Sequence, residues 1–300
     1  MAAGSILRLL SLAAIWGASF LFMRLGVPEL GPAWLMFGRV FMAALFLALV
    51  ALLFKRSLPI RHYAGHFMVL SFFNTALPFL LFAYAAQTLT ASMLAVLNAT
   101  APLWGALIGW LFFKERMSLR LALGLLLGIT GVAVLVGFDS ATAQSGAIFA
   151  IAAAAGAACC YGIATWYTRL AKPVPAFINA HGNMWGATLW LLPLLWFIPL
   201  PVAEPSAQSI QAVLVLGVVC TGVAYLLYFR LVQDLGATPT LTVTFLIPVF
   251  GVLWGHLFLQ ESIGWHTLSG VTIVVAGTML VTGFNLKALR ASAPSLKDNL

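Results

Sequence analysis

The fold of this chain is decided by two stretches of similar sequence, PLWGALIGWLFFKE at residues 102–115 and PVFGVLWGHLFLQE at residues 248–261. A proline, two glycines and a glutamate occupy equivalent positions in both, 146 residues apart. Because proline and glycine set backbone geometry, these matches indicate an internal repeat. The same offset also relates three further pairs of glycines: Gly124 and Gly270, Gly131 and Gly277, Gly137 and Gly283.

An offset of 145 residues relates the beginnings of the two copies. It aligns Trp16-Gly17 with Tyr161-Gly162, and Arg24 with Arg169. We therefore divide the chain into a first repeat at residues 1–140, a second repeat at 141–286 and a tail at 287–300.

The composition assigns the chain to the membrane. Hydrophobic residues make up 63% of it and charged residues 7%, whereas soluble domains carry about 25% charged residues. A water-soluble protein could not cover its surface with so few charges, but a helix facing lipid needs none.

Apolar runs long enough to cross a bilayer, about 20 residues each, alternate with short gaps. They predict an all-α integral membrane protein with ten transmembrane helices, five in each repeat. The predicted helices span 6–26, 33–54, 66–87, 90–113, 119–137, 146–168, 176–199, 210–233, 238–259 and 265–284.

The basic residues predict the orientation. With the N-terminus in the cytoplasm, 13 of the 15 Lys and Arg residues lie in cytoplasmic segments, leaving Arg24 and Arg39 on the other side, as the positive-inside rule predicts. Both termini are then cytoplasmic. Since each repeat has an odd number of helices, the second repeat is inverted relative to the first, a pattern typical of transporters.

The net charge of +8 does not indicate a nucleic-acid partner, because the basic residues fall in gaps between helices and form no stripe. The sequence contains no P-loop, no metal-ligand spacing and no cluster of acidic or histidine residues at one membrane face,. We therefore expect neither an enzyme nor a cofactor or metal.

The stretch WGASF at residues 16–20, together with the repeated proline, glycine and glutamate pattern, resembles the drug/metabolite transporter superfamily in its EamA-type branch. Within that branch the chain is most similar to YddG-like bacterial amino-acid exporters. The resemblance implies a multi-pass protein of the bacterial inner membrane that exports a small molecule, and leaves a homodimer open.

Polar and aromatic side chains within the apolar runs are the candidate substrate-binding residues, because exposing them to lipid is costly. Hydrogen bonding between helices, or an aromatic belt near a helix end, is the alternative for each. The candidates are Trp16, Asn74, Tyr84, Asn98, Thr100, Trp104, Tyr161, Thr165, Trp166, Thr221, Tyr225 and Tyr228.

Five further residues have predicted roles. Pro102 and Pro248 should kink equivalent helices and are candidates for gating. Glu115 and Glu261 lie at helix ends, where capping or ion pairing is favoured over proton coupling. Arg39, with no acidic neighbour one turn away, is expected to snorkel to the outer surface. Attraction of a carboxylate is the alternative role for this residue.

Two functions fit these features. The first is a secondary transporter that exports small zwitterionic metabolites, above all neutral or aromatic amino acids, through a midplane site without fixed charges. The second is efflux of lipophilic drugs or other metabolites on the same scaffold. The predicted partners are the small-molecule substrate and the lipid bilayer.

Overall fold

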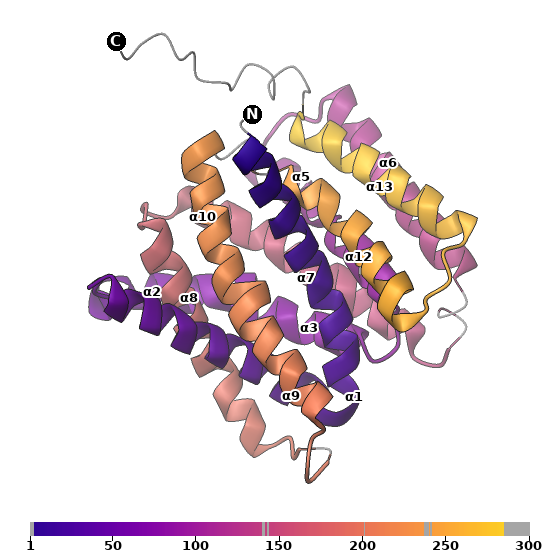
Figure 1. The fold of residues 1–300 in the computed structure, drawn as a ribbon. Coiled ribbons are helices and arrows are strands. Elements are labelled where there is room, and N and C mark those ends of the chain that lie inside the picture. Colours follow the sequence, from indigo (N-terminus) through magenta and orange to yellow (C-terminus); the bar gives the residue numbers. More distant parts are fainter. Residues whose placement is uncertain are drawn as a thin grey trace.

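A computed structural model describes residues 3–139, 142, 144–200, 202–236, 240 and 242–284. Every regular element among these residues is helical, and the helices pack into one bundle (Figure 1). The all-α prediction is thus confirmed for the described part of the chain. The predicted tail at 287–300 lies outside the described residues.

The first helix, α1 (Ala3–Leu53), is broken at Gly31, where the backbone has φ 67° and ψ 166°. Pro28 and Pro32 flank the break, and each removes a backbone donor from the helical ladder,. A straight helix of 51 residues would be about 75 Å long, more than twice the bilayer core. The break therefore divides α1 into two arms, each of bilayer length.

The rest of the first half consists of two composite rods and one regular helix. The first rod contains α2 (Ile60–Ser71), the π-helical η1 (Phe72–Ala76) and α3 (Leu77–Ala85). The second contains α4 (Ala91–Asn98) and α5 (Ala101–Phe113), and α6 (Leu119–Phe138) follows.

The second half begins with α7 (Ala147–Leu170) and α8 (Ala176–Leu191), which ends in the 3-10 segment η3 (Leu192–Trp196). A composite rod follows, made of α9 (Ala207–Leu214), the π-helical η4 (Val215–Val223) and α10 (Ala224–Leu235). The last two helices are α12 (Val243–Leu259) and α13 (Trp265–Thr282).

Seven of these helices, counting composite rods as one, are long and apolar enough to cross a membrane, and α12 is a shorter apolar helix. The count treats both arms of α1 as a single helix of 50 residues. The chain is therefore a multi-pass membrane protein built from apolar helices.

Close backbone contact joins α6 to α13, which lie side by side in Figure 1. A Cβ atom added to Gly277 would lie 2.7 Å from the Gly124 carbonyl oxygen, and one added to Gly131 would lie 3.0 Å from that of Gly270. The start of α6 thus meets the end of α13, so the two helices are antiparallel. The glycines are needed because no side chain fits between backbones this close.

Two other helix crossings use glycine in equivalent ways. A Cβ on Gly17 in α1 would lie 2.9 Å from the Gly251 nitrogen in α12. One on Gly162 in α7 would lie 2.8 Å from the Gly105 nitrogen in α5. The two contacts are equivalent, because an offset of 145 relates Gly17 to Gly162 and an offset of 146 relates Gly105 to Gly251.

The ends of α5 and α12 also match. The amide of Glu115 donates to the Gly109 carbonyl, and that of Glu261 to the Gly255 carbonyl, both at 3.2 Å. The residue before each glutamate is left-handed, with φ 55° and 56°. Equivalent sequences therefore end their helices with the same turn.

The two glutamates have structural partners, as predicted. Glu115 forms an ion pair with Arg169 at 2.8 Å. Glu261 caps the N-terminus of α4, accepting from the amides of Ala91 at 2.6 Å and Ser92 at 3.0 Å. A carboxylate at this end of a helix is favoured by the free N–H groups and the helix dipole.

Substituting Gly277 with valine should destabilise the protein, because the new side chain would meet the α6 backbone. Overpacking of this kind costs about 1–3 kcal/mol, so the unfolding temperature in detergent should fall by roughly 5 °C. The matched control is Gly137→Val, since a Cβ at Gly137 meets no atom within 4 Å. Equal unfolding temperatures for the two variants would contradict the α6–α13 contact.

Candidate functional site

Two π-helical segments lie in equivalent positions of the two halves. In η1, the Leu77 amide reaches back to the Phe72 carbonyl, and Pro78 supplies no N–H to restore the α-helical pattern. In η4, the Thr221 hydroxyl donates to the carbonyl of Leu216, five residues before it, at 2.8 Å. Such single-turn distortions are frequent at functional sites.

Each π-helical segment carries a threonine that is held by the opposite half of the chain. The Arg39 Nε in α1 donates to the Thr221 hydroxyl at 3.1 Å. The Asn183 Nδ2 in α8 donates to the Thr75 hydroxyl at 2.8 Å. Thr75 and Thr221 are 146 residues apart, and Arg39 and Asn183 are 144 apart. We call these two hydrogen bonds the threonine clasps.

Arg39 is buried, so the expectation that it snorkels to the surface is wrong. Only 4% of the residue is exposed, and its guanidinium carbon lies 3.8 Å from the centre of the Phe79 ring. The physical reason is position: Arg39 lies eight residues beyond the break at Gly31, about 12 Å along the helix. There Gly217 allows the Arg39 backbone to approach η4 closely.

Polar and aromatic residues gather around Arg39. The side chains of Tyr161 and Tyr225 lie near its guanidinium, and that of Tyr225 also lies near those of Asn74 and Asn183. Farther along α10, the Tyr228 ring lies 5.8 Å from that of Trp16. We call the following set the central cluster: Trp16, Arg39, Asn74, Thr75, Phe79, Tyr161, Asn183, Thr221, Tyr225 and Tyr228.

Six of the twelve candidate residues are therefore members of the central cluster, supplied by α1, η1, α7, η4 and α10. They combine hydroxyl and amide groups with large aromatic faces, which is suited to a small molecule that is polar at one end and apolar at the other. These six are Trp16, Asn74, Tyr161, Thr221, Tyr225 and Tyr228.

The other six candidates lie elsewhere. Tyr84 is 45% exposed near the end of α3, and the Thr165 hydroxyl bonds to its own helix at the Tyr161 carbonyl. The Trp166 Nε1 donates to the Gly105 carbonyl at 2.7 Å, and its ring stacks on Phe113. Around the gap between α4 and α5 lie Asn98, Thr100 and Trp104.

The two candidate gating prolines differ in geometry. Pro102 begins α5 directly after the break that separates it from α4, and the Thr278 hydroxyl of α13 donates to the carbonyl of Ala99 in that break at 3.1 Å. Pro248 lies inside α12, which continues past it. Equivalent prolines thus interrupt one helix and leave the other continuous.

Sequence reasoning missed Phe79 and Asn183, and it assigned Arg39 to the surface. One signal was present, because a shift of 144 residues aligns Arg39 with Asn183. The offset of this helix pair differs from the 146 that relates most of the repeat, so the alignment of the rest did not reveal it.

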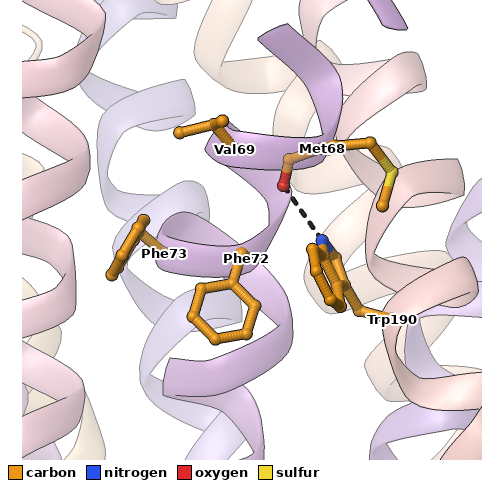
Figure 2. Close-up of a pocket in the computed structure, with 5 residues that line it drawn as sticks. All are labelled: Met68, Val69, Phe72, Phe73 and Trp190. Carbon is orange, nitrogen blue, oxygen red and sulfur yellow. Dashed lines mark hydrogen bonds between the residues drawn. The ribbon is translucent and has the colours of Figure 1, made fainter. Parts of the chain in front are cut away.

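Two surface pockets lie outside the central cluster. Figure 2 shows a shallow pocket of about 260 Å³ lined by Met68, Val69, Phe72, Phe73 and Trp190, with the Trp190 Nε1 donating to the Met68 carbonyl at 3.0 Å. Its apolar lining is suited to lipid contact. A second pocket of about 360 Å³ lies beside His62, His66, Tyr167 and Lys172.

Comparison with known proteins gives consistent results. The sequence model of the EamA-like transporter family matches residues 4–137 and again residues 148–283. The chain is 24% identical to "Uncharacterized transporter YoaV" of Bacillus subtilis, over 92% of this chain and 96% of that protein. It is 27% identical to "Probable amino-acid metabolite efflux pump" of Salmonella typhimurium, over 91% and 93%.

A crystal structure of another protein superposes on this chain with a TM-score of 0.64, covering 97% of this chain and 99% of that one. The two sequences are 17% identical, so this likeness concerns the fold alone.

The Thr75→Val variant should lower stability in detergent, because it leaves the buried Asn183 Nδ2 without its acceptor at a cost of about 1–3 kcal/mol. Thr130→Val is the control, since the Thr130 hydroxyl bonds only to the Leu126 carbonyl of its own helix. The double variant Thr75→Val, Asn183→Leu should lose less than the sum of its single changes. Additive losses would argue against this clasp.

Proposed function

Since the chain belongs to the EamA-like transporter family, we propose that it is a secondary transporter that exports small zwitterionic metabolites, with neutral and aromatic amino acids as the first candidates. The observation that carries this proposal is the central cluster, in which hydroxyl and amide groups lie beside aromatic rings between the two halves of the chain. One relative, the probable amino-acid metabolite efflux pump, supports the same substrate class.

The proposed architecture is two inverted repeats of five transmembrane helices, at residues 1–140 and 141–286. Three observations support it. The family model matches two separate stretches, α6 and α13 meet through glycines of equivalent position, and the threonine clasps recur in both halves. The ten helices follow if the two arms of α1 each cross the bilayer once.

We further propose an inner-membrane protein with both termini in the cytoplasm. The start of α1 meets the end of α10 through an ion pair between Arg8 and Asp234 at 2.6 Å. The end of α13 lies at the same end of the bundle, the upper end in Figure 1. The excess of basic residues in the predicted cytoplasmic segments supports this orientation.

Transport would proceed by alternating access, with one half rocking against the other around the central cluster. The glycine crossings between α1 and α12 and between α5 and α7 allow neighbouring backbones to slide. Pro102 is the favoured gating residue, because the helix is already interrupted there. Pro248 would act as a static bend within α12.

In this mechanism, Asn74, Tyr225 and Thr221 bind the polar groups of the substrate, while Trp16, Tyr161 and Tyr228 accept its apolar side chain. The other six candidates stay predictions as substrate-binding residues. Efflux of lipophilic drugs is the alternative function. A buried guanidinium in the site disfavours lipophilic cations by charge repulsion, and therefore favours the amino-acid proposal.

Purified protein in proteoliposomes should take up radiolabelled neutral amino acids in a saturable manner. Tyr225→Ala or Asn74→Ala should reduce uptake about tenfold, the effect of losing one hydrogen bond to a charged group. Trp196→Ala, at an 87% exposed position, should leave uptake unchanged. Stimulation by a pH gradient would add proton coupling, whereas uptake of hydrophobic cations without any amino-acid uptake would favour drug efflux.

The proposed topology can be tested by cysteine labelling in a background with the three native cysteines replaced by alanine. Ser145→Cys should react with an impermeant maleimide in intact cells, because residue 145 lies between the fifth and sixth predicted helices, in a segment assigned to the outer side. Ser57→Cys should react only after permeabilisation. Both positions are exposed, so labelling of the two from the same side would contradict the inverted arrangement.

A further inference from the structure

Two buried polar atoms in the central cluster are of opposite chemical type and lack partners. The Arg39 Nη1, a donor, and the Asn183 Oδ1, an acceptor, make no hydrogen bond with any residue that the structure describes. They belong to residues 144 positions apart, one in each half of the chain. Groups of this kind are costly in a protein interior unless something else binds them.

For Arg39 the imbalance is one of charge as well as of hydrogen bonding. Thr221 accepts from its Nε and the Phe79 ring lies against its guanidinium. No carboxylate among the described residues forms an ion pair with it, since Glu115 and Asp234 pair with other arginines. A guanidinium matches a carboxylate with two parallel hydrogen bonds, so an anionic group is the ligand that Arg39 lacks.

For Asn183 the unpartnered atom is a neutral hydrogen-bond acceptor, Oδ1. Its Nδ2 donates to the Thr75 hydroxyl, and the Oδ1 on the other side of the amide has no partner among the described residues. Its surroundings include Tyr225, whose side chain also interacts with Asn74. An ammonium group, which carries three donors and no acceptor, is suited to this oxygen and to the neighbouring side-chain oxygens.

We propose that Arg39 binds the carboxylate of the transported substrate and that the Asn183 Oδ1 accepts a hydrogen bond from its ammonium group. Tyr225 lies near both Arg39 and Asn183. This inference rests on the proposed export of zwitterions and makes it specific: the substrate must carry both groups, as an α-amino acid does.

The arrangement also links substrate binding to rocking of the two halves. Arg39 belongs to the first half and Asn183 to the second, while their clasp partners Thr221 and Thr75 belong to the opposite halves. A substrate held by both residues therefore bridges the halves. Movement of one half would change the separation of the two binding groups, and with it the affinity.

The test uses the full-length protein in detergent and measures the rise in unfolding temperature caused by phenylalanine and three analogues. Phenethylamine lacks the carboxylate, N-acetylphenylalanine lacks the ammonium, and 3-phenylpropionate lacks the amino group altogether. Phenylalanine should stabilise the wild-type protein most. Each analogue should bind at least about 30-fold more weakly, the effect of leaving one buried charged partner unpaired.

Substitution of Arg39 should remove the preference for a carboxylate, and substitution of Asn183 should remove the preference for an ammonium group. In Arg39→Gln, phenylalanine should bind no better than phenethylamine, whereas in Asn183→Leu it should bind no better than 3-phenylpropionate. Arg39→Lys keeps the charge but not the two parallel donors and should show an intermediate loss. The control is Arg61→Gln, at an exposed position, which should keep the wild-type order.

Several results would overturn the proposal. One is wild-type protein that binds phenethylamine as tightly as phenylalanine, a result that does not depend on whether any variant folds. Another is an equal loss of affinity for phenylalanine and phenethylamine in Arg39→Gln, which would indicate a structural role for Arg39. If wild-type protein binds 3-phenylpropionate through Arg39 but no amino acid, the proposed function and the Asn183 anchor fail while the carboxylate site stands.

Discussion

A polar group inside a bilayer must find its partner within the protein, and this constraint governs the arrangement of the helices. The carbonyl of Ala99, left free by the break before Pro102, accepts from Thr278 of α13. The N-terminus of α4 lacks intrahelical acceptors and is capped by Glu261. In both places an irregular backbone in one half is completed by a residue from the other, so the irregularities also hold the halves together.

Glycine residues allow the helices to pack with their backbones in direct contact. Because lipid tails are as apolar as a leucine side chain, the hydrophobic effect does not drive helices in a bilayer to associate. The contacts of α6 with α13, α1 with α12 and α5 with α7 depend instead on backbone atoms that approach directly at glycines. Two of these crossings adjoin the central cluster, since Trp16 precedes Gly17 and Tyr161 precedes Gly162.

The two halves agree in backbone and differ in chemistry at their centre. Both contain a π-helical segment with a threonine, and both supply a side chain that clasps the threonine of the other. In one clasp the donor is an arginine, and in the other it is an asparagine. Equivalent positions thereby present a cation and a neutral acceptor, so that a nearly symmetric scaffold can distinguish the two ends of an asymmetric ligand.

The sequence by itself determined the membrane class, the helical fold, the structural roles of Glu115 and Glu261 and six of the ten residues of the central cluster. These features follow from composition, from the length of apolar runs and from Gly and Pro positions, all of which act locally along the chain. Only the tertiary structure decided the place of Arg39 and its relation to Thr221 and Asn183. A single arginine in an apolar run can reach the surface or turn inward, and the packing of α1 against η4, far away in sequence, selects between these outcomes.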